Sequence, residues 1–209
     1  MALDLEEQEQ LDEAKLWWKQ HGNKVIWGVT VFLLAVAGWR GWETWSRNQA
    51  AEASMLFDQA VQATGLNDLK TAKDAAARIM ENHSSSAYAS PAAWLAGRIN
   101  LETGDVKSAR AQYQYALDHA RDGGARQMAR LRLATLLLDQ KEYDPALKLL
   151  GETFDPAFQG LANQLKGDVL SAQGKTAEAR DAYKLALEKL DDKSSLKPLV
   201  EIRLDGLGG

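Results

Sequence analysis

The chain has 209 residues, a formal net charge of −4 at pH 7 and no cysteine. Beyond residue 45 its basic and acidic side chains nearly balance. This balance argues against a nucleic-acid partner, because surfaces that bind phosphates need an excess of lysine and arginine. Without cysteine no disulfide can stabilise the fold, whichever compartment the protein occupies.

Residues 1–24 are expected to form an acidic tail. Six carboxylates lie within the first thirteen residues, and Lys15, Lys19 and Lys24 follow them. A cleaved signal peptide would begin with a short basic region, so the acidic start argues against one, although residues 35–37 (AVA) have the small-x-small form of a cleavage site. We therefore favour a retained segment over a cleaved one.

Residues 25–45 are expected to form a transmembrane helix with tryptophan belts. The run from Val25 to Trp39 carries no charge, and as a helix it spans about 22 Å of a hydrocarbon core of about 30 Å. Lys24 and Arg40 can extend this reach, because their apolar stems lie along the acyl chains while their charges reach the head groups. The alternative is a buried core helix, although core helices seldom lack a polar face. The expected membrane-interface residues are Trp17, Trp18, Lys24, Trp39, Arg40, Trp42 and Trp45.

Lysine and arginine residues close to the span predict its orientation. Three lysines precede it, at positions 15, 19 and 24, whereas Arg40 and Arg47 follow it. This small excess favours a cytoplasmic N-terminus, with the larger C-terminal part on the outer side of the membrane.

Residues 46–209 are expected to form an all-helical domain. Good helix formers dominate the segment, the whole chain has only four prolines, and no stretch alternates valine, isoleucine and threonine. Six residues recur seventy positions later, which is two periods of about 34 residues. The first copy has Gly97, Gly104, Ala109, Tyr113, Ala116 and Leu117, and the later copy has Gly167, Gly174, Ala179, Tyr183, Ala186 and Leu187.

These residue types suit a stack of helical hairpins. A small residue midway along the first helix lets the second approach closely, and a glycine between the helices can adopt the left-handed conformation that ends a helix. The motif resembles the tetratricopeptide repeat. The expected fold class is therefore all-α, with an N-terminal transmembrane helix followed by a tetratricopeptide-repeat-like α-solenoid.

A middle copy lies between these two and departs from the motif. Lys141 replaces the turn glycine, Thr153 stands in place of an alanine, and Phe154 and Pro156 are expected to end the second helix early. Upstream, helices over residues 47–64 and 68–82 are expected to form a divergent hairpin, and residues 196–204 a short capping helix. No strong helix breaker lies between Val25 and Met55, so the anchor helix is expected to continue into the domain.

The sequence offers little for catalysis, and the protein is predicted not to be an enzyme and to need no cofactor. Its three histidines, His21, His83 and His119, are far apart and are each expected to be solvated or satisfied by a neighbour. No pair of residues has metal-ligand spacing, and no glycine-rich loop has phosphate-binding spacing. Such a chain cannot assemble a nucleophile with its base.

Two groups of residues could instead recognise a protein. First helices of such repeats line the concave side, where large apolar side chains suit an extended or helical peptide segment. The candidates are Trp94, Arg98, Leu101, Met128, Leu131, Thr135, Leu138 and Leu161. The alternative is that several of them face the neighbouring hairpin. The second group is Arg121, Arg126, Arg130 and Arg132, for which a solvated helix face is favoured over an acidic docking site.

Considered over its whole length, the chain resembles the bacterial family of ancillary Sec translocon subunits. The resemblance rests on the acidic tail, residues 15–24 (KLWWKQHGNK), a single span ending in residues 38–42 (GWRGW), and the degenerate repeats. It implies a single-pass protein of the inner membrane with periplasmic repeats. The implied partners are the SecYEG translocon, a membrane-anchored periplasmic chaperone like a prolyl isomerase, unfolded secretory clients and membrane lipid. The alternative is an envelope scaffold or regulatory protein that acts through its repeats and acidic tail.

Overall fold

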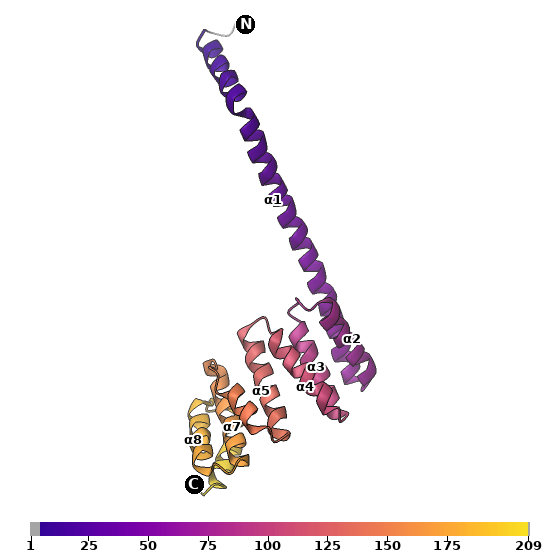
Figure 1. Cartoon of the computed structure of the whole chain (residues 1–209), viewed down its shortest axis with the longest axis vertical. Helices are drawn as coiled ribbons and strands as arrows, with labels where there is room; N and C mark the ends of the chain where they lie inside the picture. Colours follow the sequence, from indigo (N-terminus) through magenta and orange to yellow (C-terminus); the bar gives the residue numbers. More distant parts are fainter. Residues whose placement is uncertain (1–4, 209) are drawn as a thin grey trace. The chain divides into compact units, whose positions relative to one another are not determined.

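The computed structural model describes residues 5–208, with side chains from residue 10 onward. The first four residues of the predicted acidic tail and the last residue of the predicted repeat domain lie outside this range. All regular structure in the described range is α-helical, as the sequence predicts. Helix α1 runs from Leu5 to Gly65 without a break (Figure 1). The prediction that the apolar helix continues into the repeat domain is therefore confirmed.

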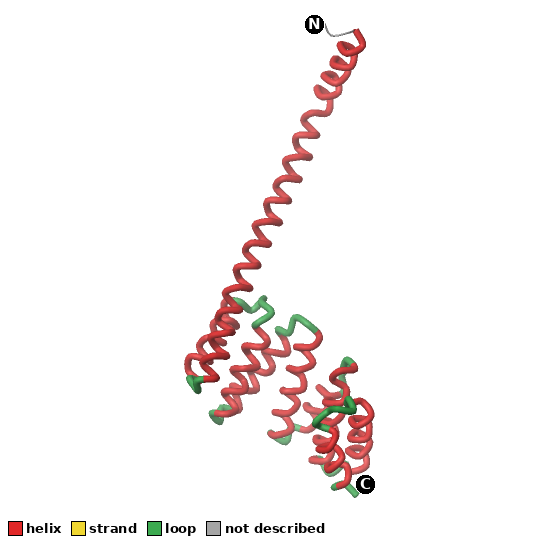
Figure 2. The backbone as a smooth tube through the Cα atoms, turned by 180° about the vertical axis from the view of Figure 1, so that it is seen from behind, coloured by secondary structure: helices red, strands yellow, loops and turns green. Residues whose placement is uncertain are grey.

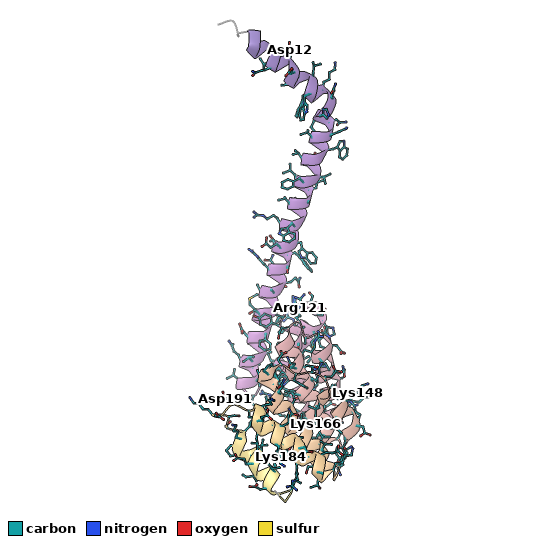
Figure 3. All side chains as sticks on the ribbon, turned by 90° about the vertical axis from the view of Figure 1, so that its left-hand side faces the viewer. Asp12, Arg121, Lys148, Lys166, Lys184 and Asp191 are labelled. Carbon is teal, nitrogen blue, oxygen red and sulfur yellow. The ribbon has the colours of Figure 1, made fainter. Side chains whose placement is uncertain are left out.

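Helix α1 contains a stretch that is long and apolar enough to cross a membrane. Within Gln10–Gly65 the mean hydropathy of the most apolar part reaches 1.5, and none of that part is buried. Figure 3 shows side chains projecting outward from this helix where it extends away from the repeat hairpins. An exposed apolar surface of this extent needs an apolar environment to cover it, which agrees with the predicted span.

The chain divides into two compact units between Gln49 and Ala50. The second unit is a series of antiparallel helical hairpins that begins with the last turns of α1 (Figure 2). Its other helices are α2 (Leu69–Asn82), α3 (Ala89–Glu102), α4 (Val106–Asp118), α5 (Gly123–Asp139), α6 (Tyr143–Leu150), α7 (Pro156–Ala172), α8 (Thr176–Lys189) and α9 (Lys197–Asp205). The predicted divergent hairpin and the predicted capping helix both agree with these bounds.

Small residues bring the helices of this unit close together. Ala60 of α1 and Ala72 of α2 are fully buried in one core cluster with Ile99 of α3. The largest cluster joins α4 to α7, and its members include Leu136 and Val169. Because alanine has a single methyl group, backbones on either side of it can approach while the larger side chains fill the remaining space.

The left-handed conformation predicted for the turn glycines of the first and last copies is confirmed, and the middle copy adopts it as well. Gly104 and Gly174 have φ angles of 81° and 76°, which is the left-handed region. Lys141, which replaces the glycine in the middle copy, adopts the same conformation with a φ of 60°. The turn geometry is thus kept where the residue type is not, at a steric cost that a glycine avoids.

The middle copy is irregular, as predicted. Helix α6 ends at Leu150 after eight residues and is followed by Gly151. Phe154 then turns into the core, where it is 6% exposed, and Pro156 occupies the first turn of α7. Two hydrogen bonds hold this connection to α5, because the amide of Gln127 donates to the Asp155 carboxylate and its oxygen accepts from the Asp155 backbone N–H.

Candidate protein-binding groove

A hollow of about 410 Å³ opens between α5 and α7, which lie side by side in the stack (Figure 1). Five of the eight residues predicted for the concave surface line it. They are Met128, Leu131, Thr135 and Leu138 from α5 and Leu161 from α7. On α5 these residues recur at helical spacing, so they share one face of the helix. The structure therefore brings most of the predicted groove together.

A second, almost wholly apolar hollow of about 160 Å³ lies beside the first, between α3 and α5. Trp94 of α3 and Ala125 of α5 line it, and Met128 lines both hollows. We call the two hollows together the concave groove. Arg98 and Leu101 were predicted to belong to it but line neither hollow, and Leu101 packs against the main core cluster instead.

Trp94 is flanked by two guanidinium groups. Those of Arg98 on its own helix and of Arg132 on α5 each lie 5.6 Å from the centre of the Trp94 ring. Cation–π attraction of this kind contributes about 0.5–1 kcal/mol at exposed positions and orders a long side chain. The indole N–H of Trp94 is buried and has no acceptor among the described residues.

A half-buried carboxylate, that of Asp168, also lines the larger hollow. Asp168 of α7 accepts hydrogen bonds from the Tyr183 hydroxyl at 2.8 Å, from Gln164 at 2.5 Å and from Arg203 of α9 at 2.5 and 2.6 Å. Burial raises the pKa of Asp168 above its ordinary value, and the hydrogen bonds and the Arg203 charge oppose that rise only in part. Burial also raises the pKa of Tyr183, and its bond to Asp168 adds to the effect.

The sequence pattern indicated Tyr183 as a repeat residue but did not indicate Asp168, Gln164 or Arg203. Asp168 and Arg203 are 35 residues apart and lie outside the positions that repeat. Arg132, Asp139, Gln164 and Leu165 also line the larger hollow and were not among the predicted groove residues. Helical spacing could have indicated Arg132 and Asp139, because they stand four residues after Met128 and Thr135 on the same side of α5.

The four arginines grouped by sequence do not form one surface. Arg126 donates to the backbone oxygen of Ala120 at 3.1 Å, and Arg130 stacks over the ring of Phe154 at 5.4 Å. Arg132 faces Trp94, whereas Arg121 is exposed. They therefore act separately, and only Arg132 contributes to the concave groove.

The histidines also lie apart. His21 stacks on Trp17, and His119 stacks on Tyr115 with ring centres 3.7 Å apart. His83 is buried, and its Nε2 lies 3.8 Å from a carboxylate oxygen of Glu52. Within the described residues no group of three or more histidine, aspartate or glutamate side chains could hold a metal ion.

The predicted membrane-interface tryptophans are all strongly exposed. Trp39 is 74% exposed, and Trp17, Trp18, Trp42 and Trp45 are each more than half exposed. Trp42 and Trp45 contact one another, with ring centres 5.2 Å apart. Lys24 and Arg40 are exposed as well. Exposed amphipathic rings near both ends of an apolar run are the pattern that a bilayer interface favours.

The stacked hairpins and the concave groove define a protein of the tetratricopeptide-like class. A family model described as a tetratricopeptide repeat-like domain matches residues 15–209. A solved structure titled "MamA RS-1 ArsTM double mutant" superimposes with a TM-score of 0.55 at 15% identity, covering 75% of this chain and 94% of that one. At this identity the likeness concerns the fold alone.

Curated relatives narrow the class further. The chain is 30% identical to the ancillary SecYEG translocon subunit of Neisseria gonorrhoeae, over 99% of this chain and all of that one. Proteins with the same description from Haemophilus influenzae and Escherichia coli are 28% and 24% identical, with at least 89% of each chain covered. The chain belongs to the family of ancillary SecYEG translocon subunits, and this membership agrees with the prediction that the protein is not an enzyme.

Proposed function

We propose that the protein is a membrane-anchored interaction subunit of the SecYEG translocon. In this proposal α1 crosses the bacterial inner membrane once, the N-terminus is cytoplasmic and the repeats are periplasmic. The name shared by the relatives supports the translocon as the partner. The exposed apolar stretch of α1 supports the anchor, since one continuous helix contributes to both that stretch and the repeat domain.

The observation that carries the proposal is the concave groove of the repeat domain. We propose that it binds segments of emerging secretory proteins or of a membrane-anchored chaperone like a prolyl isomerase, and so links the two. Its lining is mainly apolar, and Met128 is 37% exposed at the boundary of the two hollows. An exposed apolar groove of this kind is a recognised way to hold a peptide segment.

Tethering explains how such a groove works without tight binding. Attachment beside a partner raises the effective concentration to roughly the millimolar range, so that a modest affinity for each segment suffices. Two or three apolar side chains buried in the groove contribute about 1.5–3 kcal/mol each, before the cost of ordering the segment. Weak and reversible binding suits the proposed function, in which the protein must release every chain that it binds.

Site-specific photocrosslinking of the full-length protein in intact cells tests this function. A photoreactive amino acid at position 135 lies in the groove, whereas one at position 148 lies on α6 and lines neither hollow. Products identified as translocon subunits, the chaperone or secretory chains are expected from position 135 and not from position 148. Equal products from both positions, or none from position 135, would exclude the groove as the working surface.

A further inference from the structure

Two charged side chains in the larger hollow have no ion-pair partner among the described residues. Arg132 and Asp139 both project from α5 into it. The other two charged groups there, Asp168 and Arg203, already bind one another. Arg132 is held by its stacking on Trp94 rather than by a carboxylate. The groove therefore presents one unpaired positive charge and one unpaired negative charge to an occupant.

The spacing of these charges matches a helix. Arg132 and Asp139 are seven residues apart, which corresponds to about 10.5 Å along the axis of α5. A second helix lying alongside places residues seven positions apart on one face over the same distance. An extended chain covers this length in about three residue steps, and side chains three positions apart on a strand point to opposite faces. A helical occupant fits both charges at once, and an extended one does not.

The side chains of α5 that line the hollow have the same repeat. Met128 and Thr135 are seven residues apart on α5, and so are Leu131 and Leu138. Opposite them, Leu161 and Leu165 of α7 form the other wall of the hollow. The two leucines of α7 are four residues apart and so share one face of that helix. Two helices that present such faces to one another leave between them the kind of groove into which the apolar stripe of a third helix packs.

We propose that the occupant of the concave groove is an amphipathic helix of a protein partner. Its apolar stripe fills the hollow between α5 and α7. At the edge of that stripe, seven residues apart, a carboxylate pairs with Arg132 and a basic side chain pairs with Asp139. This inference rests on the proposed function and adds the chemistry by which the groove selects a partner. Charges at the rim of an apolar contact act mainly on specificity.

Three synthetic helical peptides test the charge pattern on the full-length protein in detergent. All three carry the same leucine stripe and differ at two edge positions seven residues apart, which hold Glu and Lys, Glu and Glu, or Lys and Lys. Fluorescence anisotropy should show the Glu/Lys peptide binding about threefold more tightly than the other two, since an exposed ion pair contributes at most about 1 kcal/mol. A helix that docks in the opposite direction exchanges the two edge positions, so the peptide with Lys and Glu exchanged is measured as well, and the tighter of these two orders is the one compared with Glu/Glu and Lys/Lys.

Variants should change the order of affinities in a defined way. Arg132→Glu makes both groove charges negative, so the Lys/Lys peptide should become the tightest ligand. Asp139→Arg makes both positive, so the Glu/Glu peptide should become the tightest. Lys184→Glu on the exposed surface of α8 (Figure 3) makes the same change of charge as Arg132→Glu but lies outside both hollows, and should leave the order as in the native protein.

The outcomes separate this inference from the proposed function. Equal binding of the three peptides by all variants overturns the charge pattern. A Glu/Lys peptide interrupted by two prolines cannot form the helix. If it binds as tightly as the uninterrupted Glu/Lys peptide, the proposal that the occupant is a helix is overturned. No peptide binding at millimolar concentration overturns the inference as a whole. None of these results decides the proposed function, which the crosslinking at position 135 in cells tests separately.

Discussion

The ring of Tyr183 occupies the space into which a side chain at Gly167 would project. A Cβ atom built on Gly167 would lie 2.5 Å from that ring, and the repeated pair of Gly97 and Tyr113 has the same relationship. In both hairpins the second helix therefore approaches the first so closely that only glycine fits.

Gly167→Ala is expected to destabilise the repeat domain by about 1–3 kcal/mol, the usual cost of overpacking a core. Urea unfolding of the full-length protein in detergent, followed by far-ultraviolet circular dichroism, measures the change. Gly123→Ala is the matched control, because an added Cβ at the start of α5 meets nothing closer than 3.7 Å. Equal stability of the two variants would contradict the close-approach explanation.

At the left-handed turns, two substitutions should change the stability of the domain in opposite directions. Lys141→Gly should stabilise the domain by roughly 0.5–1 kcal/mol, because glycine has no Cβ atom to clash at this φ angle. This gain outweighs the greater entropy that glycine gives to the unfolded chain. Gly104→Ala should destabilise it by about 1 kcal/mol for the reverse reason. Urea unfolding measures both effects, as shifts of the midpoint with an unchanged dependence of the unfolding free energy on urea concentration. A loss of stability in Lys141→Gly would refute the argument.

Asp168 predicts a local pH dependence of stability. The pKa of Asp168 in the folded protein is raised above its ordinary value of 3.8. At a pH between 3.8 and the folded-state pKa, the folded state therefore binds more protons than the unfolded state. The contribution of Asp168 is therefore most favourable below pH 3.8 and declines as the pH rises through the folded-state value. The stability of native protein minus that of Asp168→Asn should fall over this interval. A difference that rises with pH instead would mean that the Arg203 pairing outweighs burial.

The orientation of the chain can be measured with single cysteines, because the native sequence has none. Ser195 and Gln10 are both exposed and lie at the two ends of the described chain. A membrane-impermeant thiol reagent should label Ser195→Cys in unbroken spheroplasts and Gln10→Cys only after lysis. The reverse pattern would place the repeats in the cytoplasm and exclude the proposed periplasmic function.

The features that could be predicted from sequence are those set by neighbours in the chain or by the repeat. Gly97, Gly104 and their later counterparts identified the hairpins, because close helix packing and left-handed turns each demand one residue type. The early end of α6 followed from Phe154 and Pro156, although the helix stops slightly before them, at Leu150. These constraints act within one hairpin and do not depend on how hairpins stack.

The polar contacts between distant parts of the repeat domain could not be predicted in the same way. The bonds from Arg203 to Asp168 and from Gln127 to Asp155 join residues 35 and 28 positions apart that have no counterpart in other copies. Whether such groups meet depends on the angle between successive hairpins, which no local spacing determines. The contact of Arg132 with Trp94 joins α5 to α3 and depends on the same stacking, although helical spacing alone places Arg132 on the groove side of α5.

Met128 forms part of the wall between the two hollows. Methionine is unbranched and has three rotatable bonds, so its thioether can swing at little cost. A change of the Met128 rotamer enlarges one hollow and narrows the other while the backbone stays fixed. The same rigid scaffold can thereby admit a bulky group at either position, which suits the proposed binding of different secretory segments in turn.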